Sequence, residues 1–249
     1  WRADEVLYVV GAPQRPHFDK LFAAFRRWQP EAAARVKLVH VWFGSILGED
    51  GKPFRTRSGD TVKLAGLLDE AEERAGRLVD GKRPDLGTAE RAEIARVVGL
   101  GAVKYQDLLS NRESDYTFSW DKMLAFQGNT APYLQYQYTR ATKVVRDGAF
   151  EPGSVTGALA LQDPAELALA RQLMNFGFAL AAAAEDYKPN LLCNYLFETA
   201  AWYSKFYEAC PVLKATEPVR TSRLALCHLT ARVLRQGLDC LGIEVVDQM

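Results

Sequence analysis

The sequence predicts a protein of mixed class, with an α/β portion at its start and an all-α portion over the rest of the chain. Two short apolar runs rich in β-branched residues, 5–11 and 36–47, flank a segment with helical periodicity at 18–28. Strand, helix and strand in this order are typical of a parallel sheet with a crossover helix. After residue 61 apolar residues recur only at helical spacing, so we expect part of an open parallel sheet followed by a helical bundle.

The first portion is too small to be a complete sheet. Its helical segment has an apolar face formed by Leu21, Phe22, Phe25 and Trp28, which can cover one side of the strands. Two strands alone do not make a stable sheet, and the chain begins at Trp1 instead of a methionine. We therefore expect this chain to be a segment of a longer protein that is cut on its N-terminal side.

The all-α portion contains segments with helical periodicity at 62–78, 88–109, 131–147, 164–183, 189–208 and 217–241. A linker with glycines and a proline, 81–87, separates the first two segments. The last segment has an apolar stripe typical of a packed bundle helix, formed by Leu224, Cys227, Ala231, Leu234, Leu238 and Leu241. The sequence Leu-Gly-Ile at 241–243 predicts the end of that helix, because glycine commonly follows a helix end.

Charge and composition limit the possible classes of function. The 249 residues include 31 Lys and Arg and 31 Asp and Glu, so the formal net charge is zero. A protein that holds nucleic acid mainly by neutralising phosphates is basic, so any contact with RNA would have to be local. The most apolar helical stretch is interrupted by Arg171, Gln172 and Asn175, and we therefore expect no membrane insertion.

The cysteines and histidines are too scattered to predict a metal site. The cysteines, at Cys193, Cys210, Cys227 and Cys240, include no Cys-x-x-Cys pair. Cys227 and Cys240 lie in a helical segment among apolar residues, where we expect free thiols to pack as small apolar groups. This use of cysteine is typical of a reducing, cytoplasmic setting.

The ends of the two expected strands carry candidate binding residues. Gln14 and His17 follow the first strand, at the carboxyl edge where open parallel sheets bind ligands. A solvated turn stiffened by prolines is the alternative for this loop. His40 lies in the second strand and Gly44 follows it, where a flat ligand could approach the backbone closely. An isolated histidine in an apolar strand is also typical of simple packing.

The segment 48–60 is punctuated by glycines and carries Lys52, Arg55 and Arg57. A mobile basic loop of this kind suits a polyphosphate, because it can cover the charge of the transition state when it closes. The segment has no P-loop pattern. An ordinary solvated basic loop is equally compatible with its composition.

The segment 131–147 has two different faces at helical spacing. One face carries Tyr133, Tyr136, Arg140 and Lys143. The opposite face carries Leu134, Tyr138, Ala141 and Val145. We therefore expect Tyr138 to be structural and Tyr133 and Tyr136 to be available for stacking on unpaired bases, a contact that needs no net positive charge.

Several segments resemble, in order and spacing, the bacterial arginyl-tRNA synthetases, a family of class I aminoacyl-tRNA synthetases. The segment GKPFRTRSG (51–59) looks like that family's divergent KMSKS loop, and the other similar segments are 111–140, 206–213, 222–238 and 241–249. The resemblance implies the C-terminal part of a Rossmann-like class I catalytic sheet followed by a helical-bundle anticodon-binding domain. The expected boundaries are 1–60 for the catalytic part with its KMSKS-like loop, 61–117 for a helical connecting region that contacts the tRNA stem, and 118–249 for the anticodon-binding domain.

The resemblance also implies the reaction, in which arginine is activated with ATP and then transferred to tRNA(Arg). Gln14 matches the family's glutamine that contacts substrate arginine, and His17 lies in the same loop. Positions 40–45 match the strand end whose backbone borders the adenine, and the residues expected to bind ATP are His40, Phe43 and Gly44. Arg57 falls at the second lysine of the KMSKS pattern, and we expect it to share the covering of phosphate charge with Lys52 and Arg55.

For the helical portion the resemblance implies an anticodon site. Its residues, position by position, are Gln127, Gly128, Asn129, Thr130, Tyr133, Tyr136, Arg140, Tyr207 and Met249. The chain contains no HIGH-type motif, which carries the histidines that class I enzymes use on ATP. We therefore expect that this chain alone does not form arginyl-adenylate.

We expect a cytoplasmic monomer whose partners are tRNA(Arg), arginine and ATP, with Mg²⁺ accompanying ATP in the full-length enzyme. Neither DNA nor a membrane is an expected partner. Two other interpretations remain open from the residues: a free-standing tRNA-binding module without catalysis, and a helical scaffold whose tyrosines all belong to the core.

Overall fold

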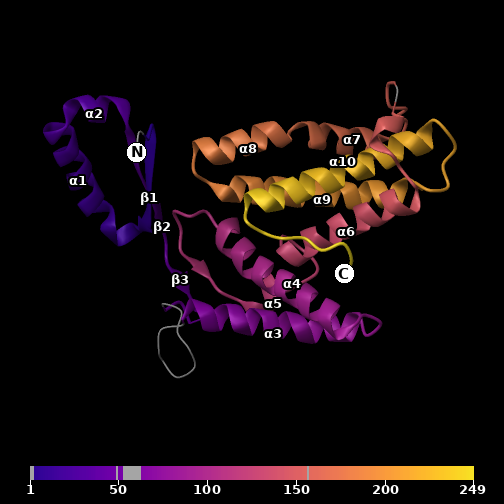
Figure 1. Ribbon diagram of the computed structural model, residues 1–249, viewed down its shortest axis with the longest axis horizontal. Coiled ribbons are helices and arrows are strands. Elements are labelled where there is room, and N and C mark those ends of the chain that lie inside the picture. The colour runs from indigo at the N-terminus through magenta and orange to yellow at the C-terminus, as the bar shows by residue number, and fades with distance from the viewer. Residues whose placement is uncertain (1–2, 49, 53–62, 156) are drawn as a thin grey trace. The chain divides into compact units, whose positions relative to one another are not determined.

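The computed structural model describes residues 3–48, 50–52, 63–155 and 157–249, and these residues form two compact units (Figure 1). The first unit comprises Trp1–Thr61 and Ser110–Ser119, and the second comprises Val62–Leu109 and Trp120–Met249. Most of the region expected to connect two domains therefore packs within the helical unit. The division into three functional parts, 1–60, 61–117 and 118–249, stays a prediction.

The first unit is built on a pair of parallel strands. Strands β1 (Glu5–Gly11) and β2 (Lys37–Phe43) pair in parallel, with Val9 opposite Val41. They are joined through η1 (Ala12–Gln14), α1 (Arg15–Trp28) and α2 (Pro30–Arg35). The expected strand–helix–strand order is confirmed. The short helix α2 escaped sequence analysis because six residues are too few for a periodic signal.

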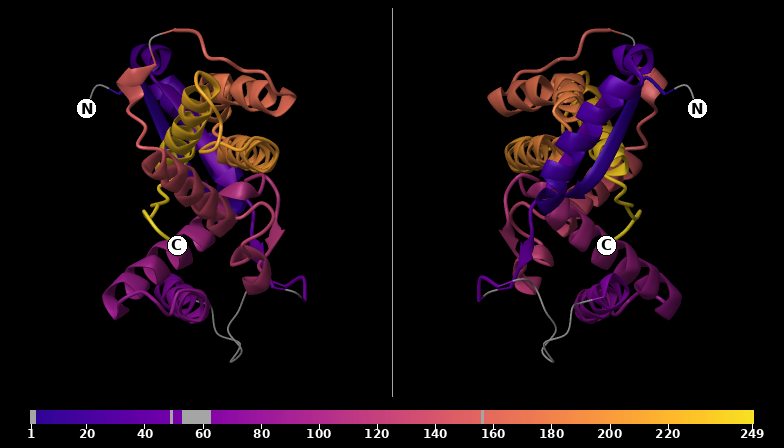
Figure 2. Two further views of the ribbon diagram at one scale, coloured as in Figure 1. Left: turned by 90° about the vertical axis from the view of Figure 1, so that its right-hand side faces the viewer. Right: turned by 90° about the vertical axis from the view of Figure 1, so that its left-hand side faces the viewer.

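Helix α1 covers one face of this sheet, as Figure 2 shows from two sides. Phe18 and Phe22 are buried, and their ring centroids lie 5.1 Å and 5.4 Å from that of Tyr8 in β1. The other face of β1 is different, because Leu7 and Val9 are 45% and 66% exposed. The sheet therefore presents an apolar face that the described residues of its own unit leave partly exposed.

The second apolar run is two strands instead of one. Strand β2 ends at Phe43, and β3 (Ile46–Leu47) pairs in parallel with β4 (Tyr116–Thr117). At the break, the Gly44 amide donates a 2.8 Å hydrogen bond to the Arg112 carbonyl, and a Cβ on Gly44 would lie only 2.5 Å from the Ser114 carbonyl oxygen. The glycine therefore makes room for a backbone segment that is far away in sequence.

The second unit consists mainly of helices. Their bounds are α3 (Leu64–Lys82), α4 (Thr88–Leu109), α5 (Trp120–Met123), α6 (Ala131–Asp147), η2 (Pro152–Ser154), α7 (Pro164–Met174), α8 (Phe176–Glu185), α9 (Pro189–Ala209) and α10 (Val219–Cys240). Helix α9 packs against α4, α6, α7, α8 and α10, and its residues Leu196, Tyr203 and Phe206 are fully buried. A Cβ on Gly99 would lie 2.7 Å from the Ala71 carbonyl oxygen, so glycine permits the close packing of α4 on α3.

Most of the helical predictions are confirmed, with two differences. The segment 164–183 is interrupted at Asn175, where α7 ends before α8 begins. By length and composition alone, the span Pro164–Glu185 is long and apolar enough to cross a membrane. Both of its helices, α7 and α8, pack on α9. Cys227 is buried as expected, but Cys240, the last residue of α10, is exposed.

Candidate nucleic-acid interface

The start of α6 is fixed by its cap. The Thr130 hydroxyl accepts a 3.3 Å hydrogen bond from the Tyr133 amide and donates a 2.6 Å hydrogen bond to the Ala125 carbonyl. Pro132 lies in the first turn, where a missing N–H has no consequence. Thr130 is only 7% exposed, so its hydroxyl is committed to capping the helix.

The two faces expected for α6 are confirmed. Leu134, Tyr138 and Ala141 are buried, whereas Tyr136 is 38% exposed. Tyr133 lies between these extremes, because it packs on the core and its ring centroid is 5.9 Å from that of Phe197. Burial raises the pKa of the Tyr133 hydroxyl above its ordinary value. Of the two tyrosines expected to stack on bases, Tyr136 is therefore the more accessible.

Arg140 joins Tyr136 to a tyrosine of another helix. Its guanidinium carbon lies 4.8 Å from the centroid of the Tyr136 ring and 5.0 Å from that of Tyr207 in α9. Arg140 also donates a 2.9 Å hydrogen bond to the Tyr136 hydroxyl, and Tyr207 is 41% exposed. We call Tyr136, Arg140 and Tyr207 the tyrosine–arginine cluster. Exposed aromatic rings beside a guanidinium are groups on which unpaired bases stack.

A buried tyrosine of α4 anchors the loop before α6. Asn129 Oδ1 lies 2.6 Å from the hydroxyl of Tyr105 in α4, which also lies 2.9 Å from the Cys193 carbonyl oxygen. The Asn129 amide nitrogen donates a 3.2 Å hydrogen bond to the Asn194 side chain. Gln127 and Gly128 are exposed at the tip, and Gly128 has a φ of +79°, which favours glycine. Sequence analysis missed Tyr105, because it falls within the ordinary apolar pattern of α4.

An open cleft of about 560 Å³ adjoins this loop and includes Gln127 in its lining. Two cations of α3 lie over aromatic rings there: Arg74 is 4.8 Å from the Trp120 ring centroid and Lys82 is 3.8 Å from that of Phe126. Asp121 also lines the cleft. None of these side chains was expected at a site, because their proximity arises only when α3 packs beside residues 120–127.

The residues expected to bind arginine and ATP belong to the first unit. Gln14 and His17 are exposed after β1, and Phe43 is 44% exposed at the end of β2. His40 is half-buried with its ring centroid 4.4 Å from that of Phe18, and its Nε2 lies 2.9 Å from the Val10 carbonyl oxygen. His40 therefore packs within its own unit, as in the alternative interpretation that this histidine serves only for packing.

The KMSKS-like loop is described only in part. Lys52 is exposed, and its backbone amide donates a 3.1 Å hydrogen bond to the Asp50 carboxylate. Arg55 and Arg57 lie outside the described residues. Across the ranges that the structure describes, no group of three or more His, Cys, Asp or Glu residues is placed to hold a metal ion.

Both portions of the chain match known families. Residues 1–120 match the family described as tRNA synthetases class I (R), catalytic domain, and residues 134–249 match the DALR anticodon binding domain. Among curated proteins, the arginine–tRNA ligases of Chromobacterium violaceum and Laribacter hongkongensis are 52% and 50% identical to this chain. These matches cover 100% and 99% of this chain but only 43% and 42% of the two relatives.

Solved structures give the same result. The arginyl-tRNA synthetase of Thermus thermophilus matches with a TM-score of 0.85 at 32% identity, over 99% of this chain and 41% of that protein. The arginyl-tRNA synthetase of Plasmodium falciparum matches with a TM-score of 0.85 at 26% identity, over 100% of this chain and 42% of that protein. The expected α/β and all-α portions are thereby confirmed as a class I catalytic fold and a helical anticodon-binding fold. The chain belongs to the arginyl-tRNA synthetase family, and it carries sequence of that family's class I catalytic domain followed by its DALR anticodon-binding domain.

Proposed function

We propose that this chain is the anticodon-binding and KMSKS-bearing part of an arginine–tRNA ligase that acts in the cytoplasm. The full-length enzyme would activate arginine with ATP, accompanied by Mg²⁺, and transfer it to tRNA(Arg). The chain spans about 43% of the length of the curated relatives that it matches. The exposed apolar face of β1, with Leu7 and Val9, supports the same proposal, because both faces of a parallel sheet are normally covered by helices, and further parts of the full-length protein would cover this one.

The observation that carries the proposal is the tyrosine–arginine cluster. Tyr136 and Tyr207 are exposed, and Arg140 lies within 5.0 Å of both ring centroids. Stacking on an aromatic ring contributes about 1–3 kcal/mol per base. A surface of this kind can therefore hold splayed anticodon bases on a chain whose formal net charge is zero.

The loop Gln127–Thr130 forms the second wall of the proposed site. Its tip is exposed, but Asn129 and Thr130 are fixed by Tyr105 and by the α6 cap. A loop held in this way loses little further conformational freedom when a base binds. Met249 would complete the site from the segment after α10, and the cleft beside Gln127 would lie next to the bound RNA.

A binding measurement tests the anticodon site. We expect Tyr136→Ala and Tyr207→Ala each to weaken binding of tRNA(Arg) about tenfold, from the loss of about one stacked base. Phe178→Ala is the matched control, because Phe178 is 78% exposed on α8 of the same unit and lies outside the cluster. Equal affinities for all three variants and the parent chain would contradict the proposal.

A second measurement separates the enzyme part from a free-standing binding module. We expect the purified 249-residue chain to show no arginine-dependent exchange of pyrophosphate into ATP, because it has no HIGH-type motif. The full-length enzyme should show that exchange. If the 249-residue chain is itself the complete product of its gene, the interpretation as a non-catalytic tRNA-binding module replaces this one.

A further inference from the structure

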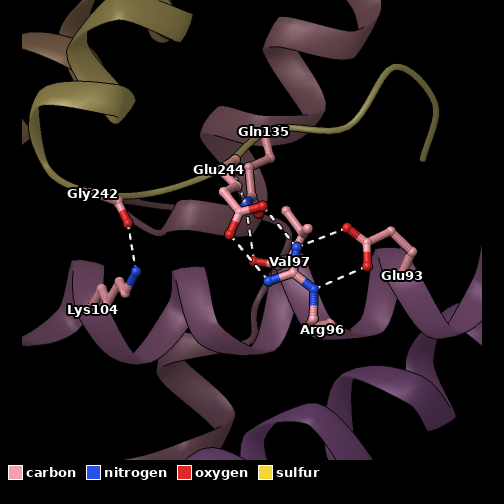
Figure 3. Close-up of polar contacts among 7 residues, drawn as sticks. All are labelled: Glu93, Arg96, Val97, Lys104, Gln135, Gly242 and Glu244. Carbon is pink, nitrogen blue, oxygen red and sulfur yellow. Dashed lines mark hydrogen bonds and ion pairs between the residues drawn. The ribbon is translucent and has the colours of Figure 1, made fainter.

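The segment Leu241–Met249, here called the tail, follows α10 and is bound to the surface of α4 and α6 (Figure 3). Its first part is anchored by burial, with Leu241 8% and Ile243 3% exposed. Gly242 between them has a φ of +68° and turns the chain. From Ile243 onward the tail forms no helix or strand, so its course depends on side chains of the helices beneath it.

Gln135 of α6 is the central contact. It is fully buried, and its amide nitrogen donates hydrogen bonds to the Glu244 carbonyl at 2.9 Å and to the Val97 carbonyl of α4 at 3.3 Å. Burying an amide is unfavourable unless it is hydrogen-bonded. The Gln135 amide nitrogen therefore links the tail to α4 as well as to α6.

Two cationic side chains of α4 donate hydrogen bonds to the tail. Arg96 donates hydrogen bonds to the Glu244 carboxylate at 2.7 Å and 3.1 Å, and it also donates to Glu93 of its own helix at 2.7 Å and 2.9 Å (Figure 3). Lys104 donates a 2.6 Å hydrogen bond to the Gly242 carbonyl. One guanidinium therefore has one carboxylate partner on the tail and a second that is not on the tail.

The tail is also fixed to α6, the helix that carries Tyr136 and Arg140 of the tyrosine–arginine cluster. The Thr139 hydroxyl of α6 lies 3.2 Å from the Val246 carbonyl oxygen and 2.9 Å from the Gln135 carbonyl oxygen. Thr139 precedes Arg140 in the sequence. Met249 follows Val246 by three residues, so its Cα lies within about 10 Å of that anchor even in a fully extended chain.

We propose that Arg96, Lys104 and Gln135 are positioning residues that hold the tail so that Met249 completes the anticodon surface. This inference rests on the proposed function. The three residues touch no RNA themselves. They restrict the tail before tRNA arrives, so less conformational freedom is lost on binding. Without them, the tail would keep only the burial of Leu241 and Ile243, the packing of Val245 on the core, the contact of Thr139 with the Val246 carbonyl and the hydrogen bond from Gln248 to Glu90.

A matched pair of substitutions in the full-length enzyme tests the proposal. Glu244→Gln and Glu93→Gln each remove one carboxylate from the same Arg96, but only Glu244 belongs to the tail. We expect Glu244→Gln to weaken binding of tRNA(Arg) about two- to fivefold, the range of a partly exposed ion pair. Glu93→Gln should leave the dissociation constant unchanged. Lys104→Gln, at an exposed position, should act like Glu244→Gln.

Two further readouts separate positioning from a merely structural role. Amide hydrogen exchange of residues 244–249 should accelerate in Glu244→Gln and Lys104→Gln but not in Glu93→Gln. The loss of affinity should vanish with a tRNA(Arg) whose anticodon bases have been removed, because the tail then has no base to contact. A loss that is equal for both tRNAs, or equal for Glu244→Gln and Glu93→Gln, would overturn the proposal.

Tyr136→Ala in the same assay tests the anticodon surface separately from the positioning role of Arg96, Lys104 and Gln135. If Tyr136→Ala weakens tRNA binding and Glu244→Gln does not, the anticodon surface stands and the positioning role is wrong. If Tyr136→Ala has no effect on tRNA binding, the proposed anticodon surface is wrong, and the proposed positioning role, which depends on it, is wrong too.

Discussion

The hydroxyl of Tyr105, a residue only 1% exposed in α4, lies 2.6 Å from Oδ1 of Asn129 in the exposed loop before α6. The same hydroxyl lies 2.9 Å from the Cys193 carbonyl oxygen of α9. Burial raises its pKa well above the ordinary value, so it remains a neutral donor that both oxygens share. A loop expected to contact RNA is thereby tied to the core of the helical unit.

Tyr105→Phe should loosen this loop. The substitution removes a hydrogen bond from the Asn129 side chain and a second one from the Cys193 carbonyl, and we expect the free energy of unfolding to fall by about 1–2 kcal/mol. Amide hydrogen exchange at residues 127–130 should accelerate. Tyr195→Phe is the control, because its hydroxyl donates a 2.8 Å hydrogen bond to the Gln172 carbonyl, away from the loop. Equal exchange at 127–130 in both variants would show that Tyr105 does not order the loop.

The packing of α3 on α4 depends on Gly99. A Cβ at this position would lie 2.7 Å from the Ala71 carbonyl oxygen, which belongs to rigid backbone. We expect Gly99→Ala to lower the free energy of unfolding by about 1–3 kcal/mol, because the two helices must move apart. Gly66→Ala in α3 is the control, since a Cβ there meets nothing within 4 Å and alanine favours the helix. Denaturant unfolding compares them; a Gly99→Ala chain as stable as the parent would contradict the close contact.

The thiols should differ sharply in reactivity. Burial raises the pKa of Cys193 and of Cys227 to about 12 and that of Cys210 to about 11, whereas Cys240 is exposed. The thiolate is the reactive form, so at neutral pH we expect a disulfide reagent such as DTNB to modify Cys240 first. Cys240→Ser should remove the fast phase, and unfolding in guanidinium should expose the remaining thiols. A fast phase that survives in Cys240→Ser would contradict this assignment.

Sequence periodicity predicted the elements that form from local patterns. The run Glu5–Gly11 and the helix Ala131–Asp147 have the expected bounds, because each combines a clear period with a clear end signal. The assignment of Tyr138 to the core and Tyr136 to the surface followed from helical spacing alone and is confirmed by their burial. The break of the second strand at Gly44 was not predictable, because it depends on backbone near Ser114.

The candidate site was also predictable only in part from the sequence. Residues that lie next to one another along α6 could be grouped from the sequence, and Tyr207 entered through a family resemblance. The contact of Arg96 with Glu244 joins residues of α4 and the tail, and that of Tyr105 with Asn129 joins α4 to a loop. No local pattern marks such pairs, because each residue also fits an ordinary exposed or apolar helix position.

The buried pair of Glu166 and Arg223 should make stability depend on pH. Glu166 is fully buried, and Arg223 donates a 2.5 Å hydrogen bond to its carboxylate. Burial alone would raise the pKa of Glu166, but the Asp163 amide and the Arg223 guanidinium outweigh it and hold that pKa below its ordinary value. This contribution to stability is therefore complete above pH 4.5 and is lost as the pH falls through the lowered value.

Glu166→Gln tests this pair directly. At pH 7 we expect the free energy of unfolding to fall by about 3–5 kcal/mol, because Arg223 keeps its buried position without a charged partner. The difference between parent and variant should shrink as the pH falls through the lowered pKa of Glu166, since the parent carboxyl group then becomes neutral, like the glutamine amide. Glu73→Gln removes an exposed pair with Arg77 and should cost less than about 1 kcal/mol. A difference between parent and Glu166→Gln that is independent of pH would contradict the assignment.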